Sequence, residues 1–169
     1  TKNMGLQEAG VDLTESGHIR VDRVSRTSAK SVYAAGDCTG VLPLASVAAM
    51  QGRIAMSHAL GDTVAPLHLR GVSANIFTDP EIAWTGLTEA QARAEGQDIE
   101  VAKFPWGALS RAITVDSPEG LTKLVLDRKT GRVLGVGIAG SGAGELIAEG
   151  TLAIEMGATA EDMKLTIHP

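Results

Sequence analysis

The 169-residue sequence predicts an α+β fold, in which a C-terminal module with an antiparallel sheet and flanking helices follows the last segment of an α/β domain. From Ser73 onward, strand and helix patterns succeed one another without regular βαβ alternation, which favours an antiparallel sheet. Glycine and proline interrupt every periodicity over residues 61–72, as is typical of a linker. We therefore expect two parts, residues 1–65 and residues 70–169.

The N-terminal part carries two strand patterns and one helix pattern. Residues 17–22 alternate apolar and polar side chains, and residues 31–35 form a more apolar run. The segment from Leu44 to Leu60 predicts a helix that ends at Gly61, because glycine readily adopts the left-handed conformation that closes a helix. Its small side chains suit close packing against a sheet or a flat ligand, and the pattern does not decide between these two alternatives.

The C-terminal part carries four strand patterns: 73–78, 98–104, 121–127 and 132–140. The last two predict a hairpin. Three segments carry helix patterns: 89–95, 143–156 and a short segment after Thr159. Two of these helices begin with a capping-box pattern, since Gln91 follows Thr88 and Asp162 follows Thr159 at the required spacing.

Composition and charge exclude several classes of partner. The formal net charge is −5 at pH 7, and no stripe of lysine and arginine offers the electrostatic footprint of a nucleic-acid binder. Two Trp, one Tyr and two Phe are too few for a base-stacking surface. No apolar run reaches the length of a membrane span, so we expect neither nucleic acid nor membrane as a partner.

The cysteine content and the chain ends add further expectations. Cys38 is the only cysteine, so no disulfide can form within the chain, and a reducing, cytoplasmic location is expected. The sequence begins at Thr1 rather than Met and stops at Pro169 without a polar tail, which suggests a fragment of a longer protein. The four histidines are widely separated, so no metal site is expected.

The stretch VYAAGDCTG, residues 32–40, is the first candidate site. Asp37 follows the second predicted strand, and Gly40 and a small-residue helix come after it. A carboxylate at such a strand end can accept hydrogen bonds from sugar-like hydroxyls, and the glycines beside it admit a nucleotide cofactor. Asp37 is therefore either a cofactor ligand or an ordinary turn residue.

This stretch, followed by Leu44 and Ala45, resembles the second flavin-binding motif of the pyridine nucleotide-disulfide oxidoreductases. The resemblance continues through the sequences DPEIAWTGLTE, FPW, SRAI, LTKL, EMGA and LTIH, and so covers essentially the whole chain. Within that family these motifs are most similar to those of dihydrolipoamide dehydrogenases. Mercuric and glutathione reductases share the scaffold but match FPW and SRAI less well.

The resemblance implies a flavoprotein that binds FAD. Asp37 would hold the ribitol chain of the cofactor, Gly36 would precede it in the motif, and the backbone amide of Ala45 would lie near the flavin ring. Residues 1–65 would be the C-terminal segment of the FAD-binding domain. Residues 70–169 would be the interface (dimerisation) domain, truncated at its C-terminus.

For the intact enzyme, the resemblance implies dithiol oxidation coupled to NAD reduction, a homodimer, and association with a 2-oxoacid dehydrogenase complex. The family's first flavin fingerprint and its redox-active CxxxxC pair lie N-terminal of the region resembled here, so the chain alone is expected to be inactive, with Cys38 an inert thiol. Two alternatives stay open: a non-catalytic dimerisation module, and another family member such as a quinone, mercuric or glutathione reductase. The choice between NAD and NADP also stays open.

His168 is the second candidate site residue. The family's catalytic base is a histidine followed by proline, and His168 precedes Pro169. In relatives, however, the base stands two positions farther along, in a sequence that commonly reads Ile-His-x-His-Pro. Either His168 corresponds to the first histidine and the base lies outside this chain, or a gap in the alignment makes His168 the base.

Overall fold

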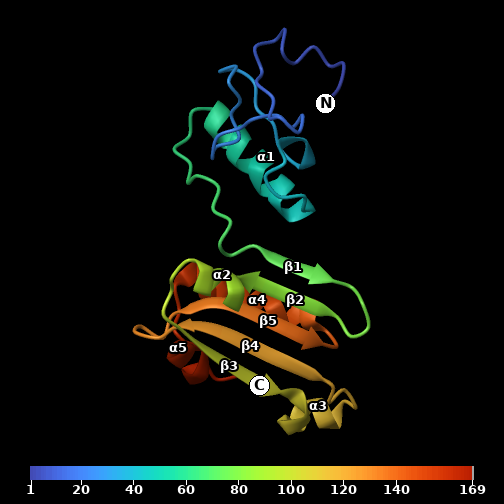
Figure 1. Cartoon of the computed structure of the whole chain (residues 1–169), viewed down its shortest axis with the longest axis vertical. Coiled ribbons are helices and arrows are strands. Elements are labelled where there is room, and N and C mark those ends of the chain that lie inside the picture. The colour runs from blue at the N-terminus through green and yellow to red at the C-terminus, as the bar shows by residue number, and fades with distance from the viewer. Residues whose placement is uncertain (169) are drawn as a thin grey trace. The chain divides into compact units, whose positions relative to one another are not determined.

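The computed structural model describes residues 1–168, and the chain divides into two compact units, Thr1–His68 (unit 1) and Leu69–Pro169 (unit 2) (Figure 1). Residues 62–69, between the helix of unit 1 and the first strand of unit 2, form neither helix nor strand. Within residues 1–168, no helix combines the length and the apolar character that crossing a bilayer requires.

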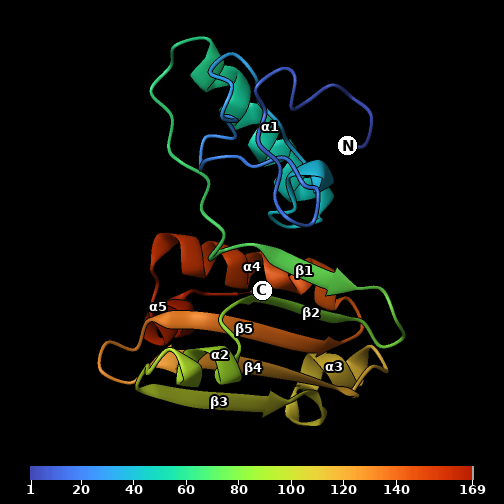
Figure 2. The same ribbon diagram turned by 45° about the horizontal axis from the view of Figure 1, so that its top comes forward.

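Unit 1 consists of turns and loops around one long helix (Figure 2). The predicted helix is confirmed as α1 (Ala45–Ala59), with Leu60 at its C-cap. Gly61 follows at a φ of 93°, the left-handed conformation expected of it. A short 3-10 helix, η1 (Asp37–Thr39), precedes α1.

The two strands predicted in unit 1 are wrong. Residues 17–22 and 31–35 contribute only to the isolated bridges Leu13↔Ile19 and Arg26↔Tyr33. A strand requires a neighbour that pairs with its backbone N–H and C=O groups along its length. In unit 1 these groups bond instead to scattered loop residues: the Ile19 N–H donates to the carbonyl oxygen of Cys38, and the Ala34 N–H to that of Ser25.

Unit 2 is built on a five-stranded antiparallel sheet in the order β1-β2-β5-β4-β3. The strands are β1 (Ser73–Ile76), β2 (Ile82–Gly86), β3 (Ile99–Pro105), β4 (Gly120–Asp127) and β5 (Val133–Gly140). The predicted α+β fold and the β4–β5 hairpin are confirmed. β2 is an addition to the predicted strands, since a run of only five residues that ends in glycine gives a weak pattern.

The helical elements of unit 2 are α2 (Glu89–Ala94), η2 (Trp106–Ala108), α3 (Ser110–Thr114), α4 (Ala143–Met156) and α5 (Ala160–Leu165). Both predicted capping boxes are confirmed, at Thr88 before α2 and at Thr159 before α5. η2 and α3 were not expected, because single turns carry no helical periodicity.

The core of unit 2 lies mainly between α4 and one face of the sheet (Figures 1 and 2). Gly150 allows α4 to approach β5 closely, since a Cβ atom there would lie 2.9 Å from the side chain of Val136. α2 covers the opposite face, where Ala92 packs with Ile99 and Val125. Successive strand residues point to opposite faces, so one sheet supplies both cores.

Candidate functional site

The loop that carries Asp37 is held open by two glycines. Gly36 has a φ of 88° and a ψ of −160°, and Gly40 has a φ of 65°, so both adopt conformations that disfavour other residues. Between them, one 3-10 turn presents Asp37 on the surface, while Thr39 is buried. Within residues 1–168, the Asp37 carboxylate makes no hydrogen bond or ion pair that would occupy it. Its oxygens can therefore accept hydrogen bonds from a ligand.

Cys38, the next residue in this loop, is half-buried and free. Its Sγ atom donates a hydrogen bond to the carbonyl oxygen of Ala35, at 3.3 Å. Among the residues described, no group of three or more His, Cys, Asp or Glu side chains is arranged to hold a metal ion.

A glutamine that the sequence reasoning missed supports the same loop. Gln51, on α1, is 1% exposed, and its Oε1 atom accepts a hydrogen bond from the N–H of Gly36 at 2.7 Å. Its Nε2 atom donates to Thr39 Oγ1 at 3.3 Å. The sequence signal was weak: Gln51 stands in the helical run AAMQGRIA, which is mostly small and apolar but also contains Arg53.

Ala45 is the first residue of α1, in the same unit as Asp37, and it is exposed. Leu44 at the N-cap offers no side-chain acceptor, and the Ala45 N–H has no acceptor elsewhere in residues 1–168. An unsatisfied N–H at a helix start is suited to an electron-rich ligand atom. The Asp37 carboxylate can therefore accept hydrogen bonds from a ligand, and the Ala45 N–H can donate one.

His168 lies in unit 2, beyond the end of α5. Its Nε2 atom forms a hydrogen bond of 2.7 Å with Oε1 of Glu149 on α4, and both side chains are about half exposed. Glu149 is nineteen residues earlier in the chain, so no local motif predicted the pair. The structure thus brings His168 to a carboxylate but places Asp37 in the other unit.

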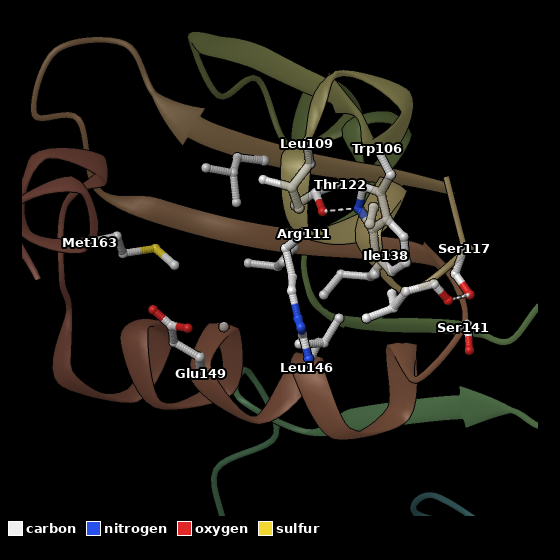
Figure 3. A pocket seen from close by; sticks show the side chains of 15 residues that line it. Trp106, Leu109, Arg111, Ser117, Thr122, Ile138, Ser141, Leu146, Glu149 and Met163 are labelled. Carbon is white, nitrogen blue, oxygen red and sulfur yellow. Dashed lines mark hydrogen bonds between the residues drawn. The ribbon is translucent and has the colours of Figure 1, made fainter. Parts of the chain in front are cut away.

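A cavity of about 410 Å³ lies in unit 2 between α3, the sheet and α4 (Figure 3). Its walls are largely apolar and come from several elements: Trp106, Leu109, Leu124, Val136, Ile138, Leu146 and Met163. The Trp106 Nε1–H donates to Thr122 Oγ1 at 2.9 Å, so the one polar group of that ring is satisfied. Arg111 extends across the opening toward α4, and Glu149 lies at its rim (Figure 3).

Residues 135–140 read GVGIAG and match the letters of a dinucleotide-binding GxGxxG. They lie inside β5, where neighbouring antiparallel strands pair with them on both sides. A dinucleotide fingerprint requires these glycines in the turn between a strand and a helix. In this strand two of the three glycines allow close packing: a Cβ on Gly135 would collide with the backbone carbonyl of Leu87, and a Cβ on Gly140 would collide with the ring of Trp106.

Glu89 and Asp127 have lowered pKa values for structural reasons. The pKa of Glu89 is lowered chiefly by the hydrogen bond from Lys123, at 2.7 Å, and then by Arg93. The pKa of Asp127 is lowered by the backbone N–H and then the hydroxyl of Thr130, within the β4–β5 turn. Neither group lines the cavity or lies near Asp37 in the chain.

Both units of the chain match known protein families. Residues 72–169, more than half of the chain, match the dimerisation domain of the pyridine nucleotide-disulphide oxidoreductases. The chain belongs to this family. Residues 1–52, which include the Asp37 loop and Gln51, match a second family description, pyridine nucleotide-disulphide oxidoreductase. The predicted family is thereby confirmed.

Several relatives of this family member are dihydrolipoyl dehydrogenases. The one from Thermus scotoductus is 46% identical over 169 residues, and the one from Bacillus subtilis is 41% identical over 168 residues. The alignments cover 100% and 99% of this chain but only 36% of each relative, so the chain spans about a third of their length.

Solved structures agree with the fold. LpdA from Mycobacterium tuberculosis superimposes with a TM-score of 0.94 at 42% identity, over 100% of this chain and 37% of LpdA. The Cu(II) complex of the flavoprotein disulfide reductase RclA from Escherichia coli gives a TM-score of 0.90 at 29% identity, over 100% of this chain and 38% of RclA.

Proposed function

We propose that this chain is the C-terminal portion of an FAD-dependent oxidoreductase of the dihydrolipoyl dehydrogenase type, which oxidises a dithiol and reduces NAD. The observation that carries the proposal is the exposed Asp37 carboxylate on a glycine-flanked loop, inside the segment that matches the family. The named relatives, 46% and 41% identical along almost the entire chain, support the dithiol substrate and NAD. A quinone, mercuric or glutathione reductase remains the alternative.

In this proposal each residue of the loop has a defined role toward FAD. Asp37 accepts hydrogen bonds from the ribitol hydroxyls, Gly36 keeps the approach free of a side chain, and the N–H of Ala45 faces the polar edge of the flavin ring. When bound, FAD supplies the electron transfer between dithiol and nicotinamide. With only one cysteine, the chain cannot form the redox disulfide within itself and does not turn over alone.

For His168 we propose the first position of the Ile-His-x-His-Pro pattern, not that of the base. In the family pattern the base is oriented by a glutamate that follows it, whereas His168 is paired with Glu149, which precedes it on α4. Assignment of His168 as the base stays the alternative. The proposal also includes domain limits at 1–65 and 70–169, a cytoplasmic location, and a 2-oxoacid dehydrogenase complex as partner.

A chimera tests the flavin function. Residues 1–169 replace the 36% of the Bacillus subtilis relative that they match, and the purified protein is examined for visible flavin absorbance and for NADH formation from dihydrolipoamide. We expect both. The matched control carries the corresponding segment of the Thermus scotoductus relative. The proposal would be contradicted if the control binds FAD and the chimera with residues 1–169 folds but binds none.

We propose further that unit 2 forms a homodimer, because it matches a dimerisation domain and α4 exposes apolar side chains. Leu146, Leu152 and Met156 are 52%, 62% and 76% exposed. Ile147 and Ala153 of the same helix are buried against the sheet and are not available. A two-fold contact would bury the exposed set against itself.

Sedimentation equilibrium over a range of concentrations tests this contact. Leu152→Lys should weaken dimerisation about ten-fold or more, since it places a cation in an apolar contact. Leu60→Lys is the matched control, because Leu60 is 77% exposed but lies in unit 1. A single monomeric mass for the unsubstituted chain at the highest concentration would reject self-association.

A further inference from the structure

Packing alone does not explain why the polar side chain of Gln51 is buried. It is 1% exposed and is the largest fully buried side chain of the described residues. A buried amide is costly unless its oxygen and nitrogen both find partners. Both partners of Gln51 belong to the loop that carries Asp37.

The hydrogen bonds form a closed network around that loop. The Gly36 N–H donates to Gln51 Oε1 at 2.7 Å, and Gln51 Nε2 donates to Thr39 Oγ1 at 3.3 Å. Thr39 Oγ1 in turn donates to the carbonyl oxygen of Gly36 at 2.7 Å. Both backbone groups of Gly36 and the hydroxyl of Thr39 are therefore engaged, and these two residues flank Asp37 and Cys38.

We propose that Gln51 is a positioning residue: it fixes the loop from Gly36 to Thr39 and so sets the direction in which the Asp37 carboxylate meets the cofactor. The inference rests on the proposed role of Asp37 in holding FAD. Because the loop conformation includes a left-handed Gly36, an external restraint prevents it from exchanging with the other conformations open to glycine.

The chemistry of the network explains why an amide is suited to this position. One planar group offers an acceptor to Gly36 and a donor to Thr39. Methionine has a similar length but neither function. An ionised glutamate has only acceptors, so the Thr39 hydroxyl could satisfy it only by giving up its bond to the Gly36 carbonyl.

Val47 provides the matched control. It lies one turn before Gln51 on α1 and is equally buried, at 3% exposed, but its side chain has no hydrogen-bonding atom. Val47→Ala therefore weakens the packing of α1 without touching the network. A role of Gln51 in packing alone would make Gln51→Met and Val47→Ala behave alike.

The first experiment measures amide hydrogen exchange by NMR in the full chain, without cofactor. In Gln51→Met we expect the Gly36 amide to exchange about ten-fold faster relative to the amides of α1, since it loses its acceptor. In Val47→Ala the exchange rates of the Gly36 amide and of the α1 amides should change by the same factor. Gly36 protection that follows α1 in both variants would overturn the inference. If Gln51→Met does not fold, Thr39→Val removes the Thr39 end of the network, so that Gln51 Nε2 loses its partner while Gln51 Oε1 can still accept from Gly36. The Gly36 amide should then exchange faster relative to α1, by a smaller factor than in Gln51→Met.

The second experiment measures the rate of FAD loss from the chimera. Gln51→Met should accelerate flavin release about five-fold or more, and Val47→Ala should not. Equal release from the parent chimera and Gln51→Met would overturn the positioning role toward the cofactor. If the parent chimera itself binds no FAD, the proposed function fails, and the exchange experiment still decides whether Gln51 orders the loop.

Discussion

Different interactions stabilise the two units of the chain. Within residues 1–168, the two clusters of buried apolar side chains both lie in unit 2, and the buried apolar residues of unit 1, such as Val11, Val47 and Ile54, belong to neither cluster. Unit 1 also has buried polar side chains that make hydrogen bonds: Thr27, Thr39 and Gln51. The difference teaches that the conformation of unit 1 depends on hydrogen bonds from side chains, whereas unit 2 is held by a sheet and its cores.

The turns of unit 1 illustrate this dependence. Asp22 Oδ1 accepts hydrogen bonds from the N–H groups of Val24 and Arg26, and Ser28 Oγ accepts from Asp12 and donates to Gly10. In unit 2, by contrast, ladders between neighbouring strands pair the backbone groups of a five-stranded sheet. Net hydrogen-bond contributions are small compared with the burial of apolar surface, so the units should differ in stability.

The largest expected effect is a two-step unfolding of the chain in urea. We expect unit 1 to unfold first and unit 2 to exceed it in free energy of unfolding by about 3 kcal/mol or more, because only unit 2 has clustered apolar cores. Residue-resolved NMR during the titration would separate the steps. A single transition with coincident loss of signals from both units would contradict this comparison.

Within unit 2, Gly135→Ala should lower the free energy of unfolding by about 3 kcal/mol. The new Cβ would collide with the backbone carbonyl of Leu87, which cannot move as a side chain does. Gly137→Ala is the control: it lies on the same strand and face, and its Cβ would meet no atom within 4 Å. Chemical denaturation of both variants measures the difference. Similar losses would show that the close approach is unimportant.

In unit 1, Asp37→Ala should weaken flavin binding to the chimera by about 1–3 kcal/mol, since the ribitol hydroxyls would lose a charged acceptor. Cys38→Ser should do much less, because serine can also donate the hydrogen bond that Cys38 Sγ makes to the carbonyl oxygen of Ala35. Fluorescence titration with FAD gives both dissociation constants. Equal weakening by the two substitutions would assign the effect to the loop conformation and not to the carboxylate.

The smallest expected effect is an acid sensitivity of α5 in unit 2. The pKa of Asp162 is lowered by the backbone N–H and then the hydroxyl of Thr159, at the capping box. The folded form thus favours the ionised carboxylate. Its contribution to stability is complete above the ordinary pKa of Asp, about 4, and is lost as the pH falls through the lowered value.

Asp162→Asn should therefore be less stable than the unsubstituted chain at neutral pH, and the difference should shrink in acid. Glu161→Gln is the control, because Glu161 lies in the same turn and pairs with Lys164, outside the capping box. Urea denaturation at several pH values provides the comparison. A difference that stays constant with pH would rule out ionisation of Asp162 as its cause.

Local signals account for the elements that were predicted correctly. The capping boxes at Thr88 and Thr159, and the helix end at Gly61, each depend on residues within one turn of each other. The strands expected at 17–22 and 31–35 fail because alternation alone cannot supply a pairing partner. β2 shows the converse, since a run of only five residues becomes an interior strand by pairing with β1 on one side and β5 on the other.

The sequence by itself determined the family, the α+β class of unit 2 and the glycine-flanked Asp37, because motifs and helix caps depend on residues that are close to one another in the sequence. Only the tertiary structure decided which side chains support the site. Gln51 reaches Gly36 from fifteen residues away, and Glu149 reaches His168 from nineteen. A hydrogen bond requires its two atoms within about 3 Å, and over such separations that distance is set by how a whole helix packs, which no local pattern encodes.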